Sequence, residues 1–312
     1  MKSSAFDCIS RGLATLRANW QLVPLIWLQN VLVVAITVAG ALVPVVVLGT
    51  SWWAGLEEWR PTSLEEVWLD FVAAVQPVAL PLSVALLATG VVWLLAFLLF
   101  CWFQAGFFGV LMAAERQALP GQPRDWRLFR TFTLRDFAGW GRRWLWRYFG
   151  FWNLYLLVVL AWMLVVLLAV WGTVAGGQRW GGPAAAGIGC GAALPLAFSL
   201  VVLAAWAWLT PPDLAREEGS VGRSSRRALE VITRRPGAVL LLGLVFVAAS
   251  LFVAIAFAPL GAVLSFFDIR EQLVAYLVAQ GVLQLLQWFV SGAVSTAAAG
   301  AAAALMWSEG RR

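Results

Sequence analysis

The stretch LVPLIWLQNVLVVAITVAGALVPVVVL (residues 22–48) contains no charged residue, and it is the first of six long apolar stretches in this chain. A helix needs about 20 consecutive apolar residues to cross the roughly 30 Å hydrocarbon core of a bilayer. Each of the six stretches exceeds that length: Leu22–Leu48, Ala79–Met112, Tyr148–Trp171, Ala184–Leu209, Ala238–Phe267 and Leu273–Met306. The sequence therefore predicts an all-α, polytopic membrane protein with six transmembrane helices in one membrane domain, residues 1–312.

The charges between the six spans predict which way the chain crosses the membrane. With the N-terminus placed in the cytoplasm, 19 of the 22 Lys and Arg residues lie on the cytoplasmic side. The other side keeps only Arg60, Arg179 and Arg270, against seven acidic residues. Because cytoplasmic loops carry the excess of basic residues, the sequence predicts an N-in/C-in topology.

The composition supports a membrane protein and indicates its surroundings. With 62% hydrophobic residues, 12% charged residues and a mean hydropathy of +0.83, the chain is not a soluble globular domain. The net charge of +6 comes from basic residues beside span ends, which favours anionic phospholipids over nucleic acid as partners. Arginine outnumbers lysine 21 to 1, which indicates a GC-rich bacterial genome and therefore the bacterial cytoplasmic (inner) membrane.

The segments that precede each pair of spans on the cytoplasmic side have the pattern of amphipathic helices lying on the membrane surface. In residues 4–20, 125–147 and 220–235, apolar residues recur at helical spacing among basic residues. The second segment is the richest in arginine and tryptophan, and its predicted lipid-surface residues are Arg127, Arg130, Arg135, Trp140, Arg142, Arg143 and Trp144. A docking site for a soluble protein is the alternative use of this helix. On the outer side, residues 63–66 form a capping box that opens a short acidic helix at 63–75.

This layout predicts a three-fold topological repeat of surface helix plus hairpin, with boundaries 1–112, 113–209 and 210–312. The segments GLATLRANWQLVPL (12–25), GFFGVLMAAERQ (106–117) and LTPPDLAREEGSVGRSSRRALEVITRRPGAVLLL (209–242) add a family resemblance. On these segments the chain resembles a broad group of uncharacterised bacterial six-span proteins, including the membrane region of some glycerophosphodiester phosphodiesterases. The resemblance implies the six-span fold only. The soluble phosphodiesterase domain is not in this sequence, and the family supplies no catalytic residues to transfer.

Missing residue types argue against catalysis. The chain has no histidine, which excludes Ser-His and Cys-His pairs and His-ligated metals or haem. The spans carry no Asp, Glu, Lys or Arg near their middle, although proton-coupled transporters usually place such groups there. Neither a phosphate-binding loop nor a C-x-x-C pair occurs. We therefore expect no enzymatic activity, no catalytic residues, no metal and no cofactor. The 20 tryptophans favour an aromatic belt at the membrane interface over pigment or quinone stacking.

The sixth span carries a polar face. Its predicted helix-packing or interface residues are Gln280, Gln284, Gln287, Ser291, Gly292, Ser295 and Gly300. Small residues at a four-residue spacing allow close approach of a second helix. The polar row has two interpretations: hydrogen bonding between packed helices, or the lining of a substrate path or an oligomer seam.

Two classes of function remain open on the sequence. The first is a non-enzymatic integral membrane protein that acts as a scaffold, anchor or accessory subunit of a larger membrane complex, with a membrane-protein partner or as a homo-oligomer. The second is a permease-like transport component that works with a separate ATPase subunit, in which the Arg-rich segment 213–235 would be the coupling helix.

Overall fold

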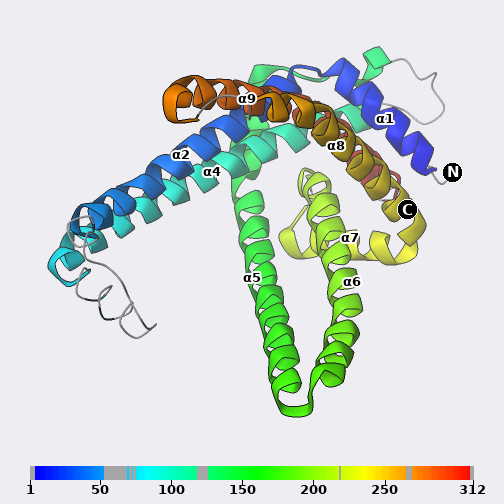
Figure 1. The fold of residues 1–312 in the computed structure, drawn as a ribbon. Helices are drawn as coiled ribbons and strands as arrows, with labels where there is room; N and C mark the ends of the chain where they lie inside the picture. Colours follow the sequence, from blue (N-terminus) through cyan, green and yellow to red (C-terminus); the bar gives the residue numbers. More distant parts are fainter. Residues whose placement is uncertain are drawn as a thin grey trace. The chain divides into compact units, whose positions relative to one another are not determined.

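The computed structural model describes residues 4–52, 69, 72, 75–117, 126–217, 219–264 and 269–309, and these residues form helices and contain no strand. Figure 1 shows their course. The helices are α1 (Ala5–Ala18), α2 (Leu22–Trp52), η2 (Gln76–Val78), α4 (Ala79–Gln117), η3 (Trp126–Phe129), α5 (Leu134–Trp180), α6 (Gly182–Leu214), α7 (Val221–Arg234), α8 (Pro236–Leu264) and α9 (Ile269–Glu309). The acidic helix predicted at 63–75 falls almost entirely outside the described residues.

Six of these helices are long and apolar enough to cross a membrane, which confirms the predicted number of spans. The six candidate spans are Leu22–Gly49, Ala79–Gln117, Leu134–Trp180, Gly182–Leu214, Pro236–Ala262 and Leu273–Glu309. The chain divides into two units, one made of Leu28–Phe100 and the other of Met1–Trp27 with Cys101–Arg312. The two units are described separately below.

The smaller unit is a helical hairpin between the later part of α2 and the earlier part of α4. Two side chains of α4 donate hydrogen bonds to backbone carbonyls of α2: the Thr89 hydroxyl to Gly40 O at 2.8 Å and the Trp93 indole to Thr37 O at 3.1 Å. Gly40 lies against Trp93 and Val92, so that a Cβ atom there would be 3.0 Å from a Val92 methyl. Side-chain donors and a close approach of the backbones thus hold this pair in register.

In the larger unit, α5 and α6 form a long hairpin. They are joined at Gly181, whose φ of 87° is accessible to glycine at no steric cost. Its backbone N–H caps α5 by donating to Gly177 O at 3.0 Å. Further along the pair, the Trp162 indole donates to the Ser199 hydroxyl at 2.8 Å. The turn and this bond fix α5 and α6 side by side.

The N-terminal part of α5 differs from the sequence prediction. Residues 125–147 were expected to form a separate helix, but the structure has the short turn η3 and then one continuous helix from Leu134 to Trp180. Thr133 caps this helix by accepting a hydrogen bond from Asp136 N at 3.1 Å. The buried residues Phe137, Gly141, Trp144, Tyr148 and Phe151 follow at spacings of three and four. Because this buried face runs unbroken into the span, nothing in the sequence ends the helix at residue 147.

The tightest packing of the larger unit joins α1 to the C-terminal part of α9. Gly12 lies so close to α9 that a Cβ atom there would overlap the carbonyl oxygen of Ala297 and lie 2.8 Å from Ala301 N. A Cβ atom on Gly300 would lie 3.0 Å from the Cα of Gly12. Along α9, Ala301 to Met306 are all buried. This seam of small residues seats α1 on α9 by its Cys8–Gly12–Thr15 face.

We predict that Gly300→Ala destabilises the protein by about 1–3 kcal/mol, because the new methyl group meets backbone atoms of α1 that cannot move aside cheaply. The matched control is Gly281→Ala on the same helix, where a Cβ atom would find nothing within 4 Å. That control should be neutral or slightly stabilising, since alanine favours a helix over glycine by about 1 kcal/mol. Thermal unfolding of the detergent-solubilised protein compares the two. Equal melting temperatures would show that the seam is not tight.

Candidate functional site

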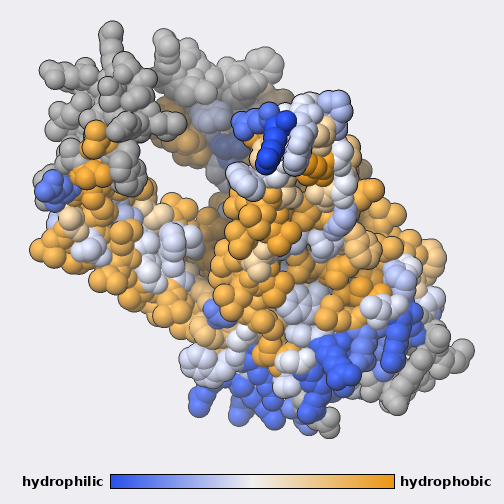
Figure 2. Space-filling model, turned by 90° about the horizontal axis from the view of Figure 1, so that it is seen from below, coloured by the Kyte–Doolittle hydropathy of each residue, from blue (hydrophilic) through white to orange (hydrophobic). Residues whose placement is uncertain are grey.

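Buried ion pairs gather in the larger unit where α1, α7 and the C-terminal ends of α4, α6 and α9 meet. We call this set the ion-pair network. It consists of Glu115 with Arg11, Asp213 with Arg216 and Arg227, and Glu309 with Arg235. On the surface, Figure 2 shows the most hydrophilic residues in a few limited areas, with hydrophobic residues over much of the rest that is coloured.

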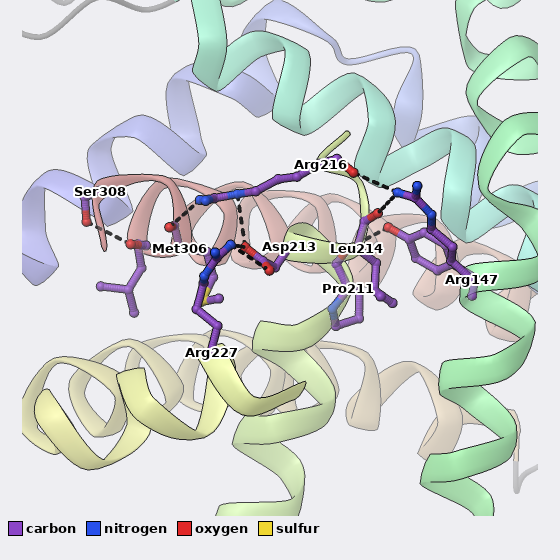
Figure 3. A network of polar contacts seen from close by, with 10 residues as sticks. Arg147, Pro211, Asp213, Leu214, Arg216, Arg227, Met306 and Ser308 are labelled. Carbon is purple, nitrogen blue, oxygen red and sulfur yellow. Dashed lines mark hydrogen bonds and ion pairs between the residues drawn. The ribbon is translucent and has the colours of Figure 1, made fainter. Parts of the chain in front are cut away.

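Asp213 is the centre of this network (Figure 3). Its carboxylate is 1% exposed and accepts from Arg227 Nη1 at 2.9 and 3.1 Å. It also pairs with Arg216 Nε at 3.0 Å. Arg216 in turn donates from Nη2 to the carbonyl of Met306 at 2.6 Å and stacks over the Trp307 ring at 5.2 Å. A single carboxylate therefore ties the end of α6 to α7 and, through Arg216, to α9.

The local sequence explains why Asp213 is held so firmly. It ends α6 in the run Thr210–Leu214, all of which is buried. The Tyr148 hydroxyl of α5 donates to Pro211 O at 2.6 Å. The turn after α6 folds back so tightly that a Cβ atom on Gly219 would lie 2.8 Å from Asp213 O. The glycine is required there because the turn backbone and the helix end are in contact.

Arg147 on α5 binds the same turn from the other side. Its Nη1 donates to the carbonyl of Arg216 at 2.8 Å, and its Nη2 donates to the carbonyl of Glu217 at 3.2 Å. These carbonyls belong to the turn after α6, and that of Arg216 also accepts from Gly219 N at 3.1 Å. Burial lowers the pKa of Arg216, and the neighbouring Asp213 carboxylate opposes that shift. All these guanidinium groups are used to hold backbone and carboxylate oxygens, which makes the cluster a structural site.

The other two pairs of the network tie further elements together. Glu115 on α4 is fully buried and pairs with Arg11 of α1. Span two was predicted to end at Met112, before Glu115, so the sequence did not predict this pair. Arg235, after α7, reaches Glu309 near the C-terminus at 2.5 Å. Next to Arg11, the buried Cys8 thiol has its pKa raised to about 11, mainly by burial and also by Glu115, which keeps it protonated and unreactive.

Asn19 was also missed by sequence reasoning, although it joins two distant segments. Its side-chain nitrogen donates to Phe129 O at 2.7 Å. Its side-chain oxygen accepts from the backbone of Thr131 at 3.0 Å and Phe132 at 2.9 Å. The Thr131 hydroxyl then donates to Val110 O at 3.1 Å. The sequence shows only that residue 19 is an asparagine between a short helix and a span, and its burial is known from the structure alone.

The predicted lipid-surface residues separate into two groups. The five arginines are exposed: Arg127, Arg130, Arg135, Arg142 and Arg143. Trp144 is 4% exposed, which differs from its predicted lipid-facing position. Trp140 is half-buried, stacks on Trp144 and covers Gly109 of α4, where a Cβ atom would lie 2.7 Å from the Trp140 Cβ. The aromatic face packs on α4 because glycines there leave room for the rings.

The predicted residues of span six, on α9, also separate. Gly292 faces the start of α2, with a Cβ atom there 3.6 Å from Val23 O, and Gly300 lies on Gly12 as described above. Ser295 is exposed and Ser291 is half-buried. The row of Gln280, Gln284 and Gln287 is half-buried, and none of the three side chains has a hydrogen-bond partner in the described part of the chain. The two glycines thus pack within the protein, whereas the glutamines are partly exposed.

Comparisons with known proteins assign this chain to no family. The chain matches no protein-family model, and no curated protein and no solved structure is similar to it at a significant level. The resemblance to the membrane region of glycerophosphodiester phosphodiesterases therefore stays a prediction from three short segments.

We predict that Asp213→Asn destabilises the protein by about 3 kcal/mol, because it leaves two largely buried guanidinium groups without their counter-charge. The matched control is Glu230→Gln, which removes the exposed pair with Arg226 on α7 and should cost at most about 0.5 kcal/mol. Both variants remove one negative charge, so net charge cannot explain a difference. Thermal unfolding in detergent would contradict the role of Asp213 if the two variants melt together.

Proposed function

We propose that this chain is a non-enzymatic integral protein of the bacterial cytoplasmic membrane that acts as a scaffold, anchor or accessory subunit of a larger membrane complex. Both termini lie in the cytoplasm in this proposal, and the ion-pair network forms the cytoplasmic end of the larger unit. The short helices α1 and α7 then run along the inner surface of the membrane.

The charge distribution supports this orientation. Nineteen of the 22 basic residues belong to the segments assigned to the cytoplasm. The ion-pair network joins α1, near the N-terminus, to the end of α4, and it joins α7 and Arg235 after it to the end of α6 and to Glu309. Elements that meet at one end of a set of spans are on one side of a membrane. The ion-pair network and the distribution of basic residues therefore both support the assignment of these segments to one side of the membrane.

The glutamine row of α9 is the observation that carries the proposal of a complex subunit. In hydrocarbon, a half-exposed amide side chain without a partner is unfavourable, because lipid offers no hydrogen bond. A glutamine side chain both donates and accepts, so a neighbouring transmembrane helix with polar residues would satisfy all three. In α5, α6 and α9, moreover, no residue in the most apolar 18-residue stretch is buried within this chain. Large apolar surfaces are thus left for lipid or for further helices.

A permease-like component driven by a separate ATPase subunit is the second candidate, and α7 favours it. This helix exposes Arg223, Arg226 and Arg234, while its opposite face is buried. Arg227 on this helix connects it to Asp213, and Arg235 directly after it connects it to Glu309. Both acids lie at the ends of spans. A soluble subunit that pressed on α7 would therefore act on α6 and α9. In this candidate the glutamine row lines a substrate path.

Anionic phospholipids complete the proposed surroundings. The exposed arginines of η3 and early α5 lie beside a span, at the level where headgroups would be. Each basic residue near an anionic membrane surface contributes about 1 kcal/mol of attraction. Exposed arginines at this position support lipid headgroups over nucleic acid as the partners of the basic segment.

We predict that the triple variant Gln280→Leu, Gln284→Leu, Gln287→Leu releases a stoichiometric membrane partner that co-purifies with the wild-type chain in mild detergent. Each lost interhelical hydrogen bond costs only about 0.6–2 kcal/mol, so all three are changed together. Ser250→Leu, an exposed polar-to-apolar change on α8, is the control and should leave the complex intact. Native mass spectrometry reports the composition. Retention of the partner by the triple variant would contradict the scaffold, and an associated ATPase would favour the permease.

The orientation has its own test, with single cysteines introduced at Ser63 and Gly222 after the three native cysteines are removed. Gly222 is exposed on α7, whereas its neighbour Ser224 is fully buried and unsuitable for labelling. A membrane-impermeant maleimide added to intact cells should label the cysteine at 63 and reach the one at 222 only after permeabilisation. Labelling of position 222 in intact cells would reverse or refute the N-in/C-in arrangement.

A further inference from the structure

Two arginines from distant parts of the sequence converge on one tryptophan. The guanidinium of Arg17, in the last turn of α1, lies 4.9 Å from the ring centre of Trp126. The guanidinium of Arg127 lies 5.9 Å from the same ring. Cation–π contacts at these distances orient both cations on the indole. Two exposed positive charges are thus held around one ring.

The site is held by the larger unit and is part of its packed structure. Trp126 is half-buried against a core cluster of Ala18, Ala114 and Phe129. Asn19 ties the end of α1 to the backbone that follows η3 through its bonds to residues 129, 131 and 132. The two elements that carry Arg17 and Arg127 are therefore fixed relative to each other. The cost of bringing two cations together is met by this packing and does not have to be supplied by a ligand.

The position of the site along the chain indicates the depth at which it lies. Arg17 precedes the first residue of α2 by only five positions, so it is about one helical turn from a candidate span. Beside it, α1 and the turn that follows it leave large apolar side chains exposed: Phe6 is 71% exposed, Leu13 52% and Trp20 61%. The seam with α9 prevents α1 from turning these residues inward, since its small face must stay on Gly300. An exposed apolar face next to a span belongs at the headgroup and acyl boundary of a bilayer.

We propose that Arg17, Trp126 and Arg127 form a binding site for the phosphate group of an anionic phospholipid in the adjacent leaflet. A guanidinium that stacks by its face still presents N–H donors at its edge, and their fork geometry matches phosphate oxygens. The exposed Arg17 guanidinium can present such donors to a phosphate, and the positive charge of Arg127 on the same indole adds electrostatic attraction. The indole and the exposed Trp20 pack against the glycerol and upper acyl region, where amphipathic rings prefer to lie. The site rests on the membrane orientation proposed above and names its lipid ligand.

The test uses the purified full-length chain in detergent, titrated with phosphatidylglycerol that carries eight-carbon chains, with native mass spectrometry counting bound lipid. Arg17→Gln should weaken binding about tenfold. Trp126→Phe, which keeps an apolar ring in the core cluster but weakens the cation–π contact, should lower it several-fold. Arg226→Gln is the control: it removes the same charge from an exposed arginine on α7 and should leave binding within twofold of wild type. Melting temperatures confirm that each variant is folded.

Three results would overturn the proposal. The first is an equal loss of binding in Arg17→Gln and Arg226→Gln, which would reduce the effect to overall charge. The second is unchanged binding in Arg17→Gln. The third is displacement of the lipid by inorganic phosphate at similar concentration, which would make the ligand a free phosphate. Failure of this site leaves the complex and the cysteine labelling intact, so it is distinguishable from failure of the proposed function.

Discussion

The buried carboxylate of Asp213 is the interaction on which the ordered end of the larger unit depends. A charge removed from water is tolerated only when opposite charges and donors surround it. Asp213 meets that requirement with two arginines, one from the following turn and one from α7. Because Arg216 then continues to the backbone of Met306, the same charge that must be paired also connects α6, α7 and α9. The need to neutralise one side chain thus fixes the positions of three helices.

Close backbone packing complements the ion pairs. At the α1–α9 seam, glycine and alanine let two helices approach until backbone atoms touch, which leaves no room for side chains of any length. Dispersion forces act over many such contacts, whereas the ion pairs act at a few points. The close packing positions α1 on α9, and the ion pair between Arg11 and Glu115 fixes the rotation of α1 about its axis. As a result, the apolar residues Phe6, Leu13 and Trp20 are held facing outward, although burying them would lower the free energy of the folded protein.

The six spans were predictable because length and hydropathy are local properties of a sequence, and a helix satisfies its own backbone hydrogen bonds. The pairing of Glu115 with Arg11 was not, because it joins residues about 100 positions apart and depends on how α1 is seated. The start of α5 was misplaced for a related reason. Aromatic residues at spacings of three and four predict a helix face, but they do not say whether that face meets lipid or protein. On this face, Gly106 and Gly109 of α4 make room for Phe137 and Trp140, and Trp144 stacks on Trp140, which only the tertiary structure shows.

The distribution of polar groups with depth also bears on function. The acids that meet basic partners here lie at helix ends, and they are consumed in holding those ends together. Between the ends, the described spans carry no Asp, Glu, Lys or Arg near their middle, and a clear polar feature left there is the neutral row of Gln280, Gln284 and Gln287. Neutral amides neither bind nor release a proton at physiological pH, so they suit hydrogen bonding between helices better than a proton relay. The neutral glutamine row further along α9 is therefore the observation that supports the proposed membrane partner on that face.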